Sequence, residues 1–163
     1  MNRMLPVAAL GAVAVLALTP SAALAGPGQD QGRHLGNDVL RSSLTPAVPT
    51  DAPINGVKPG GLPWVVASSA VRLRVSGRLD VRIEGLQVSR PDGSTDNPVG
   101  SVDALVFCGP TKVADTGPQP LTVPDGDLEL RTVVSLPSTC TDPSVLISPT
   151  ASAGGAYIAS AIG

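Results

Sequence analysis

Large apolar side chains recur at every second position after Leu62, and this feature constrains the fold more than any other. The alternation runs through residues 71–75, 79–83 and 128–136, where polar side chains, mainly arginines and carboxylates, separate the apolar ones. A period of two is typical of β-strands that bury one face and expose the other. Residues 99–108 are apolar at nearly every position, which predicts a strand buried on both faces.

Shorter strand candidates lie between turns rich in glycine and proline, at residues 64–67, 112–116, 145–148 and 157–162. The apolar parity shifts after Gly85, which indicates a bulge or bend there. Seven or eight short strands without a convincing helix predict an all-β fold. We expect an antiparallel β-sandwich, and the alternative is a small closed β-barrel.

The segments 71–75 and 79–83 are close enough to form a hairpin, and the alternation predicts its register. A two-residue loop would mix the buried and exposed faces, whereas a three-residue loop at 76–78 keeps them apart. This register sets Val75 opposite Leu79 and, on the outer face, Arg74 opposite Asp80.

The first 25 residues have the features of a cleavable secretory signal peptide: Arg3, an uncharged apolar run over 4–18, and a small-x-small site ending at Ala25. We predict cleavage between Ala25 and Gly26, and therefore a secreted, extracellular mature chain. The apolar run is shorter than the roughly 20 residues of a membrane-spanning helix, so we expect no membrane anchor after cleavage.

Residues 26–61 are dense in glycine and proline and contain few large apolar side chains, which predicts a flexible leader. Within this leader, residues 37–44 fit a two-turn helix with Asn37 as its N-cap, although two turns alone are marginal in water. The β-sandwich domain is therefore expected to cover residues 62–163.

Cys108 and Cys140 are the only two cysteines. An even pair in an exported protein predicts a disulfide rather than a metal or redox site. Only three residues are aromatic, so the core must be built mainly from aliphatic side chains. We expect Trp64 to lie in this core, and the alternative is an exposed contact surface.

Four parts of the chain resemble uncharacterised exported proteins of high-GC Gram-positive bacteria. They are PGGLPWV at 59–65, IEGL at 83–86, LPSTC at 136–140 together with Cys108, and AYIA at 156–159. The resemblance implies export and a β fold. Such proteins have no assigned activity, so the resemblance transfers no functional residue.

The charge of the chain gives little indication of a partner. Removing the predicted signal peptide takes Arg3 and no acidic residue, so the formal charge changes from −2 to about −3. A weak and dispersed charge does not indicate nucleic acid or an anionic membrane surface. We expect no nucleic-acid partner. The sequence does not identify the partner, and we expect a protein or a component of the cell wall.

The inventory of catalytic side chains is small. The only histidine, His34, lies in the predicted leader, where no rigid geometry would hold it in a hydrolytic triad. One histidine and two oxidised cysteines cannot supply three nitrogen or sulfur ligands to zinc or copper. We therefore predict no catalytic residue and no cofactor.

One segment has a weak resemblance to a calcium loop. Asp92, Ser94 and Asp96 place oxygen ligands at alternate positions, but no bidentate glutamate follows them. The turn preferences of Asp92 and Gly93 explain the same residues without a metal. We favour a plain turn, with calcium as the alternative.

Five carboxylates on or beside predicted strands could serve glycoside hydrolysis, namely Asp80, Glu84, Asp103, Asp127 and Glu129. Sugar sites usually contain more aromatic side chains than this chain offers. We favour a solvated sheet face instead, on which Asp80, Glu84, Asp127 and Glu129 lie beside Arg72, Arg74, Arg82 and Arg131.

The function is unknown at this point, and two classes of function remain open. The favoured hypothesis is a non-catalytic secreted module that binds a partner or has a structural role at the cell envelope. The alternative is a secreted enzyme that uses carboxylates, or an enzyme inhibitor whose loop 109–122 is braced by the disulfide. A pocket with paired acids and a raised pKa would favour the enzyme, and a broad exposed patch would favour the binding module.

Overall fold

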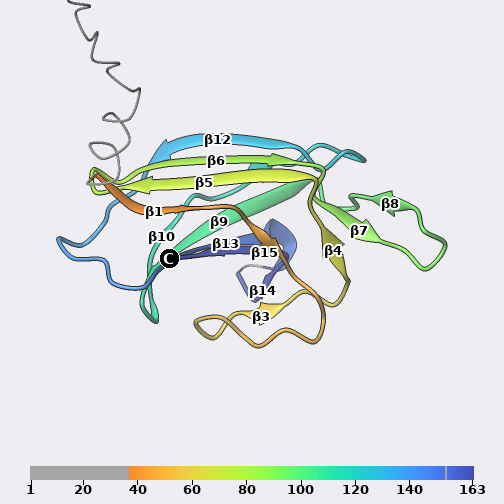
Figure 1. Cartoon of the computed structure of the whole chain (residues 1–163), viewed down its shortest axis with the longest axis horizontal. Helices are drawn as coiled ribbons and strands as arrows, with labels where there is room; N and C mark the ends of the chain where they lie inside the picture. The colour runs from red at the N-terminus through yellow and green to blue at the C-terminus, as the bar shows by residue number, and fades with distance from the viewer. Residues whose placement is uncertain (1–36, 153) are drawn as a thin grey trace, which may run out of the picture.

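Two antiparallel sheets stack face to face and form the body of the protein (Figure 1). The structure is a computed structural model, and it describes residues 37–152 and 154–163. Sheet A has the order β1-β5-β6-β12, with bounds β1 Asp38–Ser42, β5 Ser68–Arg74, β6 Arg78–Glu84 and β12 Leu128–Val133. Sheet B has the order β10-β9-β13-β15-β2, with bounds β10 Thr111–Asp115, β9 Ser101–Cys108, β13 Pro143–Pro149, β15 Ala159–Ile162 and β2 Thr45–Pro46.

Smaller pairings complete the fold. β11 (Gln119–Pro120) also pairs with β9, and β3 (Lys58–Pro59) forms a parallel pair with β14 (Ala156–Tyr157). A three-stranded sheet contains β4 (Trp64–Val65), β7 (Gln87–Ser89) and β8 (Thr95–Asp96), and Thr150–Ser152 is a 3-10 turn. Within the described ranges, no helix is long and apolar enough to cross a membrane.

The predicted all-β antiparallel sandwich is confirmed. Eight strands of the described residues have four residues or more, in agreement with the seven or eight that the sequence predicts, and the others have two or three. The alternative of a closed barrel is wrong, because the strands divide into separate sheets. The predicted signal peptide and His34 lie outside the described residues.

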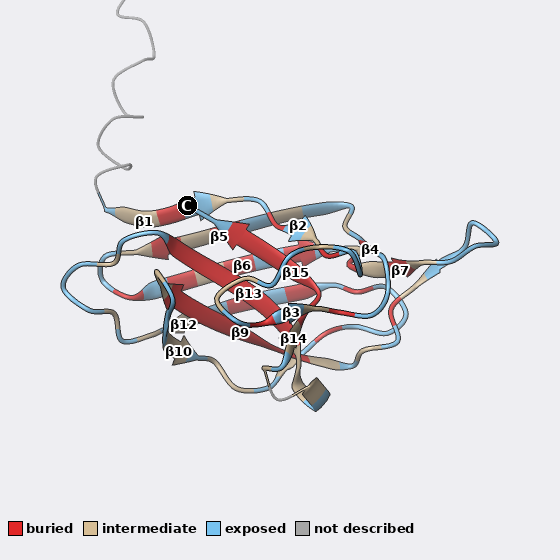
Figure 2. Ribbon diagram, turned by 90° about the horizontal axis from the view of Figure 1, so that it is seen from below, coloured by how far each residue is buried: buried red, intermediate tan, exposed pale blue. Residues whose placement is uncertain are grey.

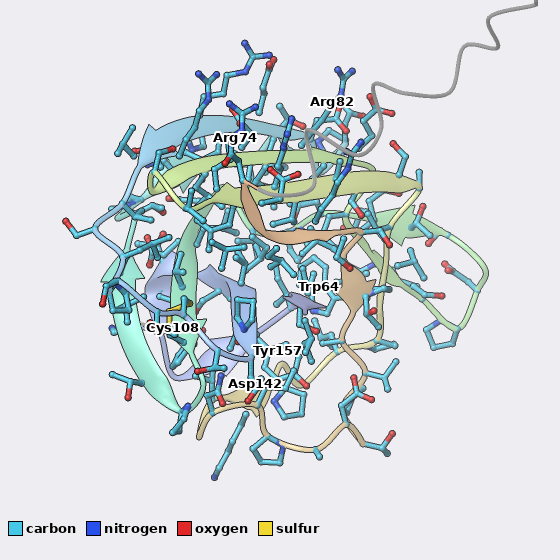
Figure 3. The ribbon with its side chains drawn as sticks, turned by 60° about the vertical axis from the view of Figure 1, so that its left-hand side comes forward. Trp64, Arg74, Arg82, Cys108, Asp142 and Tyr157 are labelled. Carbon is cyan, nitrogen blue, oxygen red and sulfur yellow. A yellow bond between two sulfur atoms is a disulfide. The ribbon has the colours of Figure 1, made fainter. Side chains whose placement is uncertain are left out.

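The alternating residues of sheet A form one side of the main core. Leu73, Leu79 and Ile83 are at most 1% exposed, and they face the apolar residues of β9 and β13. Burying a large aliphatic side chain stabilises a fold by about 1.5 to 3 kcal/mol, so each of these residues contributes substantially to the stability. Trp64 is 4% exposed and belongs to the same cluster, which confirms that it is a core residue (Figure 3).

A second, smaller core covers the other side of sheet B. β9 and β13 are buried along nearly their whole length (Figure 2), as the continuous apolar run of β9 predicts. Leu105, Phe107 and Leu146 pack against Val57 and Tyr157. We call residues 47–60 the strap, because this segment crosses the outer face of sheet B.

Hydrogen bonds fasten the strap to the body of the protein. The hydroxyl of Tyr157 donates to the carbonyl of Ala52 over 3.0 Å, and the side-chain amide of Asn55 donates to the hydroxyl of Ser144 over 3.0 Å. Desolvation by burial is the main cause that raises the pKa of Tyr157. The strap is therefore an integral part of the fold.

The predicted leader and domain boundary need correction. Residues 37–44 do not form a helix: Asp38–Ser42 is strand β1, which pairs with β5. Leu40 and Leu44 are 3% and 4% exposed, so the folded domain begins before residue 62. A segment dense in glycine and proline is expected to be flexible only when no apolar face is available for it to pack against. Here both sheets have such an apolar face.

The predicted register of the first hairpin is wrong by two residues. The structure pairs Leu73 with Leu79, and the outer face brings Arg72, not Arg74, opposite Asp80. The loop does have three residues, but they are 75–77, because the last position of such a loop needs a positive φ and Gly77 supplies φ 81°. A shift of two residues leaves every side chain on its predicted face.

Two further predictions are confirmed. Gly85, at φ 67°, separates β6 from β7, and the chain leaves sheet A at this bend. A disulfide joins Cys108, at the end of β9, to Cys140 in the segment that follows β12. The disulfide thereby links sheet B to the segment that follows the last strand of sheet A.

Candidate functional site

The outer side of sheet A gathers arginines from all four of its strands. The register aligns Arg41 of β1 with Arg72 of β5, Arg72 with Asp80 of β6, and Asp80 with Arg131 of β12. Neighbouring positions add three more arginines. We call this surface the arginine face; it consists of Arg41, Arg72, Arg74, Arg78, Arg82 and Arg131.

The arginine face is positive although the chain as a whole is negative. It holds six of the eleven Lys and Arg residues in the sequence. Four carboxylates contact or flank them, those of Asp38, Asp80, Glu84 and Glu129, which leaves a formal charge of +2 on a chain of formal charge −2. The expectation of dispersed charge is therefore wrong, because strand pairing brings together residues up to 90 positions apart.

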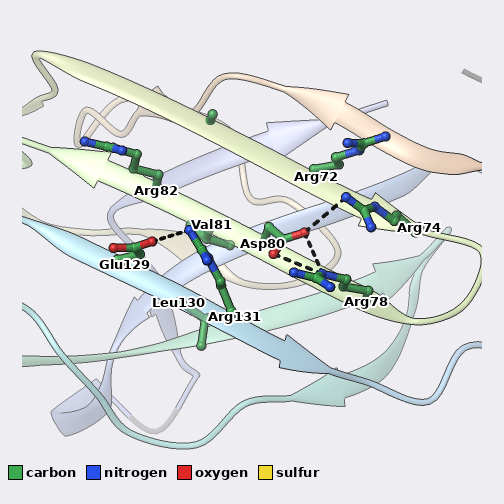
Figure 4. Close-up of a pocket in the computed structure, with 10 residues that line it drawn as sticks. Arg72, Arg74, Arg78, Asp80, Val81, Arg82, Glu129, Leu130 and Arg131 are labelled. Atoms are coloured by element: carbon green, nitrogen blue, oxygen red, sulfur yellow. Dashed lines mark hydrogen bonds and ion pairs between the residues drawn. The ribbon is translucent and has the colours of Figure 1, made fainter. Parts of the chain in front are cut away.

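Most of these arginines are paired with a carboxylate and remain accessible. Asp80 lies between Arg78, at 3.2 Å, and Arg74, at 3.8 Å (Figure 4). Arg82 contacts Glu84 at 2.7 Å, and the side chain of Arg82 is 68% exposed. Exposed pairs of this kind contribute only about 0 to 1 kcal/mol, so these guanidinium groups can exchange a carboxylate for another anion at little cost.

Arg41 differs from the other five. It is exposed, and no carboxylate of the described residues forms an ion pair with it. Its backbone partner, Arg72, lies between Arg41 and Asp80 in the row across the sheet. The β1 end of the arginine face is therefore its most cationic part.

Arg72 anchors the face to the fold. Its Nε donates to Oδ1 of Asp38 over 2.8 Å, and the side chain of Asp38 is only 4% exposed. Within the described residues, the other oxygen of Asp38 and the Nε of its cross-strand neighbour Arg74 are buried without hydrogen-bond partners. Removing one member of a buried ion pair is strongly destabilising, so Arg72 has a structural role.

One carboxylate of this face, that of Glu84, is held in its charged form. The hydrogen bond from Ser68 over 2.8 Å, and then the hydrogen bonds and charge of Arg82, keep the pKa of Glu84 below its usual range. The same contacts with Glu84 raise the pKa of Arg82. A carboxyl group that works as a general acid needs the opposite shift.

The face is shallow and open. A depression of about 420 Å³ lies over β5, β6 and β12 (Figure 4). It is lined by every arginine of the face except Arg41, and by Asp80, Glu129, Ala70, Val81 and Leu130. Figure 3 shows Arg74 and Arg82 pointing away from the body of the protein, on the side opposite to Tyr157. This shape suits a long ligand lying on a surface better than a small enclosed one.

In the segment considered for calcium, Asp92 and Ser94 lie between β7 and β8, and Asp96 is part of β8. Oδ1 of Asp92 accepts hydrogen bonds from the backbone N–H and the hydroxyl of Ser94, at 3.0 and 2.7 Å. Both oxygens of Asp96 accept from Arg90, at 2.6 and 2.8 Å. In the part of the chain that the structure describes, no three His, Cys, Asp or Glu side chains are grouped to hold a metal.

The five candidate carboxylates do not form one site. Asp80, Glu84 and Glu129 lie on the arginine face, as the interpretation of a solvated sheet face predicts. Asp127 caps the bend after β6, where it accepts from the N–H of Gly85 over 2.9 Å. Asp103 is on sheet B, 7% exposed, and accepts from the hydroxyl of Thr150.

Half of the segment 109–122, considered as a braced inhibitory loop, lies in strands. Residues 111–115 form β10 and residues 119–120 form β11, and both strands bond to β9. The segment is therefore part of the edge of sheet B rather than a protruding loop.

Sequence reasoning missed two members of the arginine face. Arg41 lies in the segment interpreted as a leader, and no periodicity around it indicates that it joins β5. Arg78 belongs to the predicted hairpin loop 76–78, whereas the need for glycine at the third loop position places it in β6.

No protein-family model, curated protein or solved structure matches this chain.

Proposed function

We propose that the chain is a secreted, non-catalytic binding module whose arginine face binds an anionic polymer of the cell envelope. The observation that carries this proposal is the row Arg41, Arg72, Asp80 and Arg131, with its neighbouring arginines, on an open sheet surface. A phosphate- or carboxylate-bearing polymer of the cell wall is the ligand class that this surface fits.

The chemistry of arginine supports this ligand class. A guanidinium group is planar, always charged and able to donate two parallel hydrogen bonds to one phosphate or carboxylate. Neighbouring strands lie about 4.8 Å apart, so arginines on successive strands offer repeated contacts to a repeating chain. Arg41, Arg78 and Arg82 remain accessible enough to make them.

The state of the carboxylates supports binding rather than catalysis. Asp80, Glu84 and Glu129 each contact an arginine, and the pKa of Glu84 is lowered. An acid-base pair would need one carboxyl group whose pKa is raised. These groups instead limit the positive charge of the face, which favours exchangeable over irreversible binding.

Export is part of the proposal. The first 25 residues have the pattern of a signal peptide, and the Cys108–Cys140 disulfide is compatible with an oxidising compartment. A module at the outside of the cell would meet the anionic polymers of the wall directly.

The test is co-sedimentation of the purified protein with isolated cell walls of a high-GC Gram-positive bacterium, at increasing salt. The variant R41S/R78S/R82S removes three charges from the arginine face, and K58S/R90S/K112S removes three charges elsewhere. Arg72 is left in place because it pairs with buried Asp38. We expect binding to the walls to fall with salt and to be lost in the first variant only.

The matched triple variant separates a specific face from a general effect of charge. Equal losses in both variants, or binding that ignores both salt and R41S/R78S/R82S, would contradict the proposal. Walls extracted with hydrofluoric acid lose their phosphodiester-linked polymers, so the comparison with untreated walls tells a phosphate ligand from a carboxylate one.

A further inference from the structure

The outer edge of β12 is an unpaired strand edge with neither a bulge nor a proline. β12 closes sheet A on one side, and no other described strand pairs with this edge. Its register with β6 runs without a bulge over all six residues, 128–133, and the strand contains neither lysine nor proline. Such an edge is a template for pairing with another strand.

The other three edges of the two sheets are protected. β1 has a bulge between Asp38 and Leu40, and β10 has one between Lys112 and Ala114. β2 has only two residues and ends at Pro46. Bulges, prolines and very short strands prevent edge pairing, and β12 has none of these. Its two charged residues, Glu129 and Arg131, have opposite signs, so they can pair with those of a second copy.

The backbone of β12 presents alternate residues to the free edge. The N–H of Val134 donates to the carbonyl of Gly77 over 2.9 Å, toward β6. Because backbone groups alternate in direction along a strand, Glu129, Arg131 and Val133 direct their N–H and C=O groups away from β6. The carbonyl of Asp127 already accepts from Thr122, so the free part of the edge is 129–133.

We propose that this edge pairs with the same edge of a second copy, antiparallel and two-fold symmetric about Leu130. In this register Glu129 lies opposite Arg131 of the other copy, and Arg131 lies opposite Glu129. Both residues face the free edge, so the two opposite pairs also exchange backbone hydrogen bonds. Sheet A then becomes one continuous sheet of eight strands.

The charges favour this register, because it is the symmetric one that sets Glu129 opposite Arg131; an axis through Thr132 would set Arg131 opposite Val133 and form no charge pair. A two-fold axis through Glu129 would place glutamate opposite glutamate, and an axis through Arg131 would place arginine opposite arginine. Registers centred between residues would oppose outward groups with inward ones, which cannot bond. The two side chains are free to exchange partners, because their ion pair within one copy, at 2.6 Å, leaves them 68% and 60% exposed.

The contact area of an edge pair is small, so we expect a weak and reversible dimer. Sedimentation velocity over a series of protein concentrations measures it. R131E or E129R places like charges opposite each other twice in every dimer and is expected to weaken association by roughly tenfold or more. The double variant E129R/R131E restores opposite charges and is expected to restore the dimer.

Two controls keep the result interpretable. R90E makes the same charge change on the β7-β8 hairpin and is expected to leave the dimer unchanged. Fluorescence of the buried Trp64 reports whether each variant is folded. In addition, exchange of the Glu129 and Arg131 amide protons should slow as concentration rises, while the Leu130 amide, which faces β6, should not change.

The inference stands apart from the proposed anion binding, whose test leaves Glu129 and Arg131 intact. A wild-type protein that stays monomeric at the highest soluble concentration would overturn it. A dimer that R131E and E129R do not weaken, or that the double variant does not restore, would show that the copies meet through a different surface.

Discussion

Gly77 and Gly93 form a matched pair that tests how closely β12 packs against the first hairpin. Their φ angles are almost the same, 81° and 83°. A Cβ atom on Gly93 would meet no atom within 4 Å, whereas one on Gly77 would collide with the carbonyl oxygen of Val134. Alanine at these positions therefore introduces the same backbone strain but a different steric conflict.

The expected costs follow from these contacts. An alanine held at positive φ costs roughly 1 to 2 kcal/mol, and this is the whole expected effect of Gly93→Ala. Gly77→Ala adds the displacement of Val134, whose N–H donates to the Gly77 carbonyl over 2.9 Å. Losing that hydrogen bond costs about 1 kcal/mol more, and the shifted end of β12 brings the total to about 3 kcal/mol.

Urea unfolding followed by Trp64 fluorescence measures both variants, since Trp64 is the only tryptophan and is buried. We expect Gly77→Ala to lower the free energy of unfolding by about 1 to 2 kcal/mol more than Gly93→Ala. Equal losses in the two variants would refute the packing of Val134 against Gly77, and with it the register of β12 at this end.

Three other predictions follow from particular contacts. C108S/C140S opens a connection of 32 positions and should lower the free energy of unfolding by about 3 to 4 kcal/mol, measured by the same urea titration. Tyr157→Phe removes the hydrogen bond to Ala52 and should cost about 1 kcal/mol and speed limited proteolysis within the strap; an unchanged cleavage rate would contradict the docking of the strap. Ser68→Ala removes the largest cause of the lowered Glu84 pKa, so an NMR titration should show this pKa rising toward its usual value. The pKa of Glu84 is lower in the folded protein than in the unfolded chain. Its contribution to stability is therefore present above its unfolded-state pKa and is lost as pH falls through its folded-state pKa. Ser68→Ala should reduce this dependence of stability on pH.

The sheet faces could be predicted from the sequence because burial acts on side chains one at a time. A period of two identifies Leu73, Leu79 and Leu130 as inward residues whatever strand lies beside them. The predicted sheet faces are correct although the predicted hairpin register is wrong by two residues, since such a shift moves no side chain to the other face.

The strap and β1 could not be predicted in this way, because their partners are distant in sequence. Residues 38–59 are ordered by packing against β5, β9 and β13, and no local sequence pattern within 38–59 predicts those contacts. The continuous apolar run of 99–108 did indicate that a further layer of the chain packs against this strand. A strand buried on both faces requires a third layer, and the glycine- and proline-rich segment was the chain available to supply it.

The arginine face lies beyond sequence reasoning for a related reason. Arg41, Arg72 and Arg131 are ordinary exposed positions of three separate strands, and only the strand order brings them together. Net charge hides such a surface, because acidic residues elsewhere on the chain outnumber its excess of two positive charges.

The assembly of this surface can be observed directly in a NOESY spectrum of the folded protein. Arg41 opposite Arg72, and Asp80 opposite Arg131, are pairs whose backbone groups point away from each other, and such pairs bring their Hα protons close. The described register predicts strong Hα–Hα cross-peaks for both pairs. An Asp80–Arg131 cross-peak without one between Arg41 and Arg72 would mean that β1 does not join sheet A, and the row of arginines would not exist.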